Sequence, residues 1–414
     1  MARVLSPHHF KIHRNPHATP LESYGTRQRR FICKKGAQVA QQEIRSLPGY
    51  KPTPLVDLAG LAGAAGIARI WYKDEGSRFG LKSFKAVGGA YAVLRLLQRE
   101  IRRRTGEIRA SATDIIEGKY GDVVSAITLA CATDGNHGRA VAWGAHIFGC
   151  SCVIFIHPLV SAGRRDAMAE LGAQVVCVAG NYDDSVREAA KQADLNGWFV
   201  VADSGYENYM EVPCDVMHGY TLIVEEIMGQ LPSGERPTHT FIQAGCGGLA
   251  GAVCAHLWQR WESKRPRFIV VEPRQAACLY QSGVEGKPVV VTGKLDTVMA
   301  GLACGAVSLV AWEILDQGAD DFMIIPDAAA VECMRILANG VYGDKPIVAG
   351  ESAVGGLAGL LCSVADGESA KALALDAESR VLVIGTEGAT DPVLYRTIVG
   401  RSAEEICACP GRPT

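Results

Sequence analysis

The chain of 414 residues is 48% hydrophobic and 21% charged, the composition of a globular protein with a well-filled core that, at this length, is expected to divide into two domains. Its formal net charge of −2 gives no electrostatic reason to expect nucleic acid or an anionic membrane surface as a partner. No apolar run approaches the roughly 18 residues that span a bilayer, so no membrane partner is expected.

The chain opens on a basic segment, residues 1–17, and its first acidic residue is Glu22. This segment lacks the apolar core of a signal peptide, and chain ends are commonly loose. We therefore predict a frayed, solvated N-terminal arm.

A lysine in apolar surroundings follows further along the chain. In "RFGLKSFKAVGGAYAV" (residues 78–93), a predicted loop runs into a predicted helix, and Lys85 has Phe84, Ala86 and Val87 as neighbours. A lysine near an apolar wall loses affinity for its proton and becomes an amine that can form a Schiff base. A surface lysine that reaches water is the alternative.

The middle of the chain alternates between predicted strands and predicted helices. The strands are residues 122–131, 151–157, 175–180 and 198–203, and the helices are 161–172, with Ser161 as N-cap and Gly172 as C-cap, and 182–197, ending at Gly197. A second series follows, with strands at 238–245, 267–273 and 380–388 and a helix at 249–261.

This alternation predicts an α/β fold of open, mostly parallel twisted sheets flanked by helices, in two domains with a cleft between them. Ligands of such sheets bind at the carboxyl ends of the strands. That rule selects four turns, which follow Cys131, Asp203, Ala244 and Gly385.

The turn after Ala244 is rich in glycine. Gly245, Gly247 and Gly248 lie between an apolar strand and a helix, where the helix N-terminus can bind a phosphate without a basic side chain. The segment also fits a dinucleotide-binding fingerprint, and Glu272 ends the next strand where a ribose-binding acid would belong. A nicotinamide dehydrogenase and a turn that serves only packing both remain open at this point.

The order of Lys85, "TDGNHG", "GCGG" and "GTEG" resembles the fold-type-II pyridoxal-phosphate enzymes of the tryptophan synthase β-like superfamily. Within them, the chain resembles the diaminopropionate ammonia-lyase family most closely. The resemblance runs from about residue 47 to about residue 391 and includes "KDEGSRFG", "NYDDSVR" and "VEPRQAACLY".

The resemblance implies a role for each part of the cofactor site. Lys85 would hold pyridoxal 5'-phosphate as an internal aldimine, Asn136 would hydrogen-bond its phenolic oxygen, and Thr386 would face its pyridine nitrogen. The backbone that would cradle the phosphate is that of Gly245, Cys246, Gly247, Gly248 and Leu249. A neutral hydroxyl beside the ring nitrogen leaves it largely unprotonated, which favours expulsion of a β-leaving group over transamination.

The implied reaction is α,β-elimination of 2,3-diaminopropionate to pyruvate and two ammonia, through an aldimine and aminoacrylate, with Lys85 taking the α-proton. The resemblance makes Asp134 a second base, for the D isomer, and its charge can pair with the second ammonium of the substrate; a helix cap is the alternative. Asp203 and Thr133 would lie near the substrate, although Asp203 could equally act as a cap.

Several residues depart from the family or stay ambiguous. Lys82 stands where the related lyases carry asparagine; it either shares a helical face with Lys85 or reaches water. Ala353 replaces the last glycine of a G-E-S-G turn. Cys278 and Cys304 match cysteines that recur in the family, and they either pair or remain thiols. His137 and Arg139 are predicted to pack or to make structural hydrogen bonds.

The fourteen cysteines show no zinc-type spacing, so no metal is expected, and many thiols in a large chain indicate a reducing, cytoplasmic location. We expect a large cofactor-binding domain from residues 1–95 and 206–414, a small domain from 96–205, and, by resemblance, a homodimer. A serine, threonine or hydroxyaspartate dehydratase, a nicotinamide dehydrogenase and a non-catalytic pyridoxal-phosphate carrier remain alternatives, and the preference for D or L substrate stays open.

Overall fold

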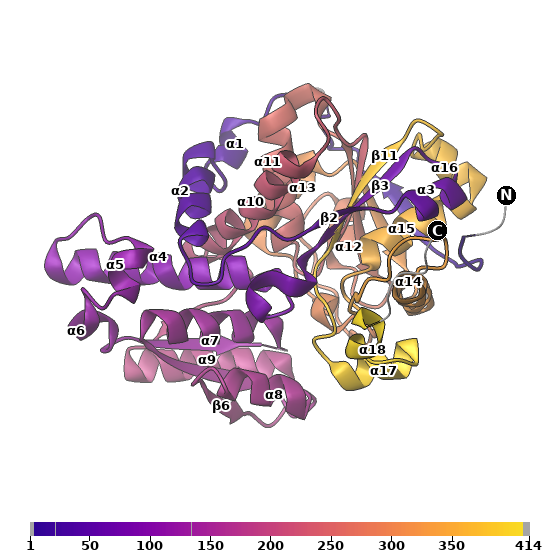
Figure 1. Cartoon of the computed structure of the whole chain (residues 1–414). Coiled ribbons are helices and arrows are strands. Elements are labelled where there is room, and N and C mark those ends of the chain that lie inside the picture. Colours follow the sequence, from indigo (N-terminus) through magenta and orange to yellow (C-terminus); the bar gives the residue numbers. More distant parts are fainter. Residues whose placement is uncertain (1–3, 21, 134, 409–414) are drawn as a thin grey trace. The chain divides into compact units, whose positions relative to one another are not determined.

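A computed structural model describes residues 4–20, 22–133 and 135–408 of the chain (Figure 1). The contacts divide it into two compact units, which are described separately. Unit 1 comprises Met1–Phe31, Pro52–Ser77 and Ile223–Thr414, and unit 2 comprises Ile32–Lys51 and Arg78–Leu222. A search of the described helices finds none that combines the length and the apolar character that crossing a membrane requires.

Unit 1 is built on a seven-stranded sheet in the order β1-β10-β9-β8-β11-β3-β2. The strands are β1 (Lys11–Arg14), β2 (Leu55–Asp57), β3 (Arg69–Asp74), β8 (His239–Gln243), β9 (Arg267–Pro273), β10 (Asp321–Ile325) and β11 (Arg380–Gly385). The five central strands are parallel, and the edge strands β1 and β2 pair antiparallel to their neighbours. Parallel strands covered on both faces are buried along their whole length, as β8 and β10 are here.

Helices cover this sheet. They are α1 (Thr26–Arg29), α3 (Ala59–Ala65), α11 (Gly248–Trp261), α12 (Cys278–Glu285), α13 (Leu309–Gly318), α14 (Asp327–Asn339), α15 (Gly355–Ala365), α16 (Gly367–Ala372), α17 (Pro392–Val399) and α18 (Ala403–Cys407). Figure 1 shows α11 and α13 on the opposite side of the strands from α15 and α3. Helix α15 comes so close to the sheet that a Cβ on Gly356 would lie 2.5 Å from the carbonyl oxygen of Phe241, so only glycine fits there.

Unit 2 contains a four-stranded parallel sheet in the order β6-β5-β4-β7. Its strands are β4 (Thr128–Ala132), β5 (Ser151–Ile156), β6 (Gln174–Cys177) and β7 (Phe199–Val200), and its helices are α2 (Lys34–Arg45), α4 (Lys85–Thr105), α5 (Ala112–Ile116), α6 (Gly121–Val124), α7 (Asn136–Phe148), α8 (Ala162–Ala169) and α9 (Tyr182–Asn196). Helix α10 (Glu211–Gln230) contains the boundary between the units. Helices α4 and α7 pack closely because Gly89 lies against Ala140.

The predicted α/β fold with mostly parallel sheets flanked by helices is confirmed. The helix predicted at 182–197 is α9, which begins with a capping box between Asn181 and Asp184 and ends at Gly197 with a φ of 67°. The prediction of a strand from residue 122 onward is wrong in its first half, because α6 occupies Gly121–Val124 and β4 begins at Thr128. Burial of Val124 in a helical turn overrides the strand propensity of a β-branched residue.

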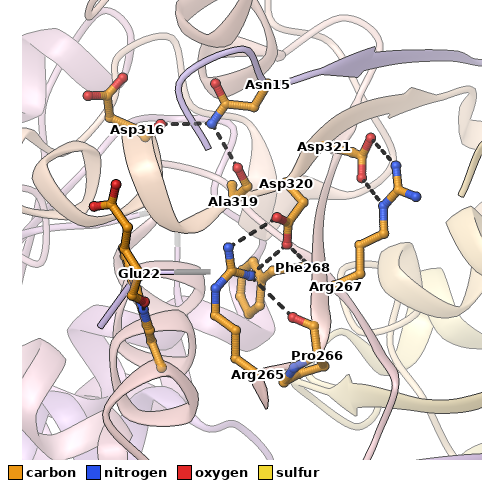
Figure 2. A network of polar contacts seen from close by, with 11 residues as sticks. Asn15, Glu22, Arg265, Pro266, Arg267, Phe268, Asp316, Ala319, Asp320 and Asp321 are labelled. Carbon is orange, nitrogen blue, oxygen red and sulfur yellow. Dashed lines mark hydrogen bonds and ion pairs between the residues drawn. The ribbon is translucent and has the colours of Figure 1, made fainter. Parts of the chain in front are cut away.

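The prediction of a frayed N-terminal arm is also wrong for the described part of the arm. Strand β1 pairs with β10, and Leu5 is buried. The Asn15 side chain donates to the carbonyl oxygens of Asp316 and Ala319, at 2.7 Å each, next to the Arg265–Asp320 ion pair (Figure 2). An edge strand of this kind has only partly buried side chains, so its sequence carries little apolar signal.

A buried ion pair anchors β3 in unit 1. Lys73 is fully buried, and its Nζ lies 2.7 Å from the Glu226 carboxylate, 2.7 Å from the Thr53 carbonyl oxygen and 2.9 Å from Gln230 Oε1. All three ammonium donors are therefore used, as a charge without access to water requires.

We predict that Glu226→Ala lowers the free energy of unfolding by about 3–5 kcal/mol, because it leaves the Lys73 ammonium buried without its carboxylate. Urea unfolding monitored by circular dichroism measures the change. The control is Asp57→Ala, which removes a pair with Arg69 whose side chains are 36% and 39% exposed and should cost less than about 1 kcal/mol. Equal losses in the two variants would contradict a stabilising buried pair.

Candidate active site

Lys85 is the first residue of α4 in unit 2, directly after a backbone segment with unusual conformation. Phe79 and Lys82 have positive φ values of 50° and 55°. Contacts with α7 hold this segment: the Phe79 ring packs on Trp143 at 4.6 Å between centroids, and Arg139 donates to the Leu81 carbonyl oxygen at 3.2 Å. The amine of Lys85 is thus presented by a loop that α7 keeps in place.

Lys82 lies outside the helix, so the prediction that it could share a helical face with Lys85 is wrong. Its φ lies in the left-handed region, a conformation that asparagine tolerates better than lysine does. Lys82 is partly buried.

The Lys85 ammonium donates a short hydrogen bond to Asp203 Oδ2, and both side chains are largely buried, with 20% and 17% exposed. Burial alone would raise the pKa of Asp203, but the electrostatic effects of the nearby His137 and Lys85 side chains and the hydrogen bond from Lys85 together lower that pKa well below its ordinary value. Asp203 is therefore an ionised partner for the lysine.

The carboxylate is held in place through its backbone. Asp203 follows β7, where the Tyr209 hydroxyl donates to the Val200 carbonyl oxygen at 2.9 Å and accepts from the Ala202 N–H at 3.0 Å. His137, on α7, lies with Nε2 3.0 Å from the Val201 carbonyl oxygen and Nδ1 3.8 Å from Asp203 Oδ2. The prediction that His137 makes a structural hydrogen bond is confirmed, but the histidine also faces the carboxylate.

The turn after β4 carries three more predicted residues. Thr133 is buried, and its hydroxyl accepts the N–H groups of Gly135 and Gly138 at 3.0 Å each, which leaves its own proton to donate. Asn136 is the first residue of α7. Asp134 lies outside the described residues, so its predicted role stays a prediction.

The glycine-rich turn of unit 1 leads into α11. Gly247 has a φ of 97°, and the first turn of α11 has no acidic residue and no side-chain cap. A Cβ on Gly247 would lie 3.2 Å from both Ala311 Cβ and Leu279 Cδ1. The turn is therefore packed on one side, and the helix N–H groups can receive a phosphate.

Thr386 follows β11 in a buried network that joins three segments of unit 1. Its hydroxyl donates to the Ser352 carbonyl oxygen at 3.1 Å and accepts from Gln243 Nε2 at 3.0 Å. Gln243 also donates to the carbonyl oxygens of Ala353 and Ile384, at 2.9 and 2.8 Å. Sequence reasoning missed Gln243; its only signal is a polar residue at the end of an apolar strand that precedes the glycines.

The structure gives Glu272 a different role from the ribose-binding acid considered above. It is buried and accepts the N–H groups of Leu279 and Tyr280 at 2.9 and 2.6 Å, at the start of α12, and burial raises its pKa to about 8. Its oxygens are thus occupied by a helix terminus, which removes the main support for a dinucleotide site.

Cys278 and Cys304 are both thiols and are not joined by a disulfide. Burial raises the pKa of Cys278, whose Sγ lies 3.6 Å from the carbonyl oxygen of Gly245 in the glycine-rich turn. Of the predicted site residues, unit 2 brings Lys85 and Asp203 into contact, and unit 1 holds the glycine-rich turn and Thr386.

The sequence matches the family model "Pyridoxal-phosphate dependent enzyme" over residues 46–387. The chain therefore belongs to the pyridoxal-phosphate dependent enzymes, and pyridoxal phosphate is its cofactor.

Within this family, the chain is a homologue of diaminopropionate ammonia-lyase. It is 39% identical over 374 residues to the diaminopropionate ammonia-lyase of Escherichia coli K12, covering 89% of this chain and 92% of the relative. The crystal structure of the holo enzyme from Escherichia coli aligns with a TM-score of 0.86 at 36% identity, covering 95% of this chain and 97% of that one. The same enzyme in complex with D-serine aligns with a TM-score of 0.85 at 36% identity, covering 96% and 99%.

We predict that Gly247→Ala weakens pyridoxal-phosphate binding at least about tenfold, because a Cβ at this positive φ would press on Ala311 and Leu279 and displace the turn. Absorbance titration of the apoenzyme with the cofactor measures the change. Gly234→Ala is the matched control, since Gly234 has a φ of 81° with nothing within 4 Å of the added Cβ. Unchanged cofactor affinity in Gly247→Ala would rule out this turn as the phosphate site.

Proposed function

We propose that the chain catalyses the α,β-elimination of 2,3-diaminopropionate to pyruvate and two ammonia. The contact that supports this most strongly is the hydrogen bond from the Lys85 amine to Asp203. It places a lysine of the type that Schiff-base chemistry uses beside an ionised carboxylate, in a chain 39% identical to a diaminopropionate ammonia-lyase.

The residues present fit the cofactor. The first turn of α11, which has no side-chain cap, suits the phosphate, Lys85 suits the aldehyde and Asn136 suits the phenolic oxygen. Thr386, whose hydroxyl accepts from Gln243 and donates to the Ser352 carbonyl oxygen, would place a neutral oxygen and not a carboxylate beside the ring nitrogen. When bound, pyridoxal phosphate withdraws electrons from the α-carbon of the amino acid and so stabilises negative charge there.

Lys85 then serves as the base. With the substrate bound to the cofactor, the free Lys85 amine would lie near the α-carbon and would remove the α-proton. Asp203, held at the end of β7, orients the Lys85 amine and forms an ion pair with the Lys85 ammonium once the proton has been taken up.

The second amino group of the substrate decides between a diamino acid and a hydroxyamino acid. We propose that Asp134 supplies the negative charge that pairs with the β-ammonium and serves as base for the D isomer. Thr133, whose hydroxyl keeps a proton to donate, would contact the substrate carboxylate.

The wider setting is also proposed. Residues 1–95 and 206–414 would form the large cofactor-binding domain and residues 96–205 the small one, in a homodimer. The thiol state of the described cysteines supports a reducing, cytoplasmic location.

Borohydride reduction of the holoenzyme followed by peptide mapping should place the cofactor on Lys85, because a Schiff base becomes a stable secondary amine on reduction. Lys85→Ala should lose the adduct and at least about 10²-fold in kcat, whereas Lys82→Ala should keep both. An adduct on Lys82 in the parent enzyme would overturn the assignment.

Asp134→Ser should lower kcat for D-2,3-diaminopropionate by about 10²–10⁴-fold, the usual contribution of a general base, with a smaller loss for the L isomer, for which Lys85 is the base. Coupled measurement of pyruvate gives both rates. The control is Asp183→Ser, the same change at an exposed carboxylate on α9. Equal losses for the two isomers would contradict a base role for Asp134.

A further inference from the structure

Gln243 is a buried glutamine at the end of β8, directly before the glycine-rich turn, and only 2% of its surface is exposed. Its amide nitrogen Nε2 donates to the carbonyl oxygens of Ala353 and Ile384, at 2.9 and 2.8 Å, and to the Thr386 hydroxyl at 3.0 Å. Its amide oxygen Oε1 accepts the N–H of Gly356 at 3.2 Å. Because carbonyl oxygens only accept and a backbone N–H only donates, these partners determine which end of the amide is the nitrogen.

The two glycines that begin α15 let this helix reach the amide. A Cβ on Gly355 would lie 2.8 Å from Gln243 Cβ, and a Cβ on Gly356 would lie 3.1 Å from Gln243 Oε1. A side chain at either position would therefore press on the glutamine. One amide thus joins the ends of β8 and β11, the turn that contains Ser352 and Ala353, and the first turn of α15.

Gln243 also determines how the Thr386 hydroxyl can be used. An amide nitrogen does not accept a hydrogen bond, so the hydroxyl accepts from Gln243 and cannot donate to it. Its proton is left for another acceptor, and in the part of the chain that the structure describes the Ser352 carbonyl oxygen takes it, at 3.1 Å. A ring nitrogen beside Thr386 would be a second acceptor for the same proton. The amide therefore leaves the threonine proton available to that nitrogen.

The Thr386 hydroxyl has two hydrogen-bond partners, the Gln243 amide and the Ser352 carbonyl group, and both are uncharged. The carboxylate of Glu387 accepts the Ser352 N–H and the Thr390 hydroxyl, at 3.1 Å each, and so it holds the turn and not the threonine. A carboxylate next to the ring nitrogen would raise the pKa of that nitrogen and favour transamination. An amide of the same size holds Thr386 without that charge.

We propose that Gln243 is a positioning residue that holds the Thr386 hydroxyl for the cofactor and so favours elimination over transamination. It acts through Thr386 and not by contact with the cofactor. This inference rests on the proposed function, in which Thr386 faces the ring nitrogen of pyridoxal phosphate.

The first test is a double-mutant cycle on cofactor affinity, measured by absorbance titration of the apoenzyme with pyridoxal phosphate. Gln243→Met removes the amide at similar side-chain length and should weaken binding about tenfold, as should Thr386→Val. The double variant should bind no more weakly than Thr386→Val alone, because Gln243 acts through the threonine. The control is Gln28→Met, at a glutamine that is also 2% exposed and donates to Gln317 Oε1 at 2.6 Å; it should bind as the parent does. Unchanged affinity in Gln243→Met, or losses that multiply in the double variant, would overturn the proposal.

The second test uses Gln243→Glu in the holoenzyme, which keeps the size of the side chain and reverses its hydrogen bond. A carboxylate at this position accepts from Thr386, which turns the threonine proton away from the ring nitrogen and adds a negative charge. Transamination per pyruvate released should rise about tenfold, the effect of one pKa unit at the ring nitrogen, and should rise further as the pH is raised and the glutamate ionises. The loss of holoenzyme absorbance during turnover, with coupled measurement of pyruvate, gives this ratio. A ratio equal to that of the parent at every pH would contradict the proposal.

Circular dichroism first shows that each variant is folded, and should Gln243→Met not fold, the glutamate variant decides. The parent enzyme separates the two proposals. If the parent holoenzyme forms no pyruvate from 2,3-diaminopropionate, the proposed function itself is wrong. If it does, and the Gln243 variants bind the cofactor and divide between the two reactions as the parent does, only the role of Gln243 is wrong.

Discussion

The arrangement of unit 2 depends on the contact between the Lys85 ammonium and the Asp203 carboxylate. A half-buried amine is useful as a nucleophile and base only if its charge can be accommodated at some moments and removed at others. The surrounding structure positions both members of this pair. The loop before α4, with its positive φ values, positions the Lys85 amine. Hydrogen bonds from Tyr209 and His137 hold the end of β7 that carries the Asp203 carboxylate.

Unit 1 contributes a different kind of order. The part of unit 1 that is predicted to hold the cofactor consists of backbone and buried polar groups. These are the N–H groups of α11 that follow Gly247 and the hydrogen-bonded network of Gln243, Thr386 and Ser352. These groups carry no net charge. We propose that they receive the phosphate and face the ring nitrogen of the cofactor, an arrangement that would favour elimination over transamination.

Local sequence signals predicted much of the fold. Gly197 ends α9 as predicted, and the predicted glycine-rich turn follows β8, with a positive φ at Gly247. The same reasoning failed for β1 and α6, because the first exists only through its pairing with β10 and the second through the burial of Val124. Such long-range contacts are absent from a local pattern.

The sequence predicts the site residues whose role depends on residue type. It does not predict those whose role depends on the orientation of the side chain. Lys85 was conspicuous among apolar neighbours. Glu272 had the right position for a ribose-binding acid, but its side chain caps α12. The orientation of His137 toward Asp203 and of Gln243 toward Thr386 depends on where separate strands end.

The central claim is that this chain eliminates the β-amino group of 2,3-diaminopropionate as ammonia. The most direct measurement is the kcat/KM for pyruvate formation by the purified holoenzyme with D- and L-2,3-diaminopropionate and with L-serine. Loss of a charged hydrogen bond to the β-group should make serine at least about tenfold poorer than diaminopropionate. A holoenzyme that prefers serine would contradict the claim and point to a dehydratase.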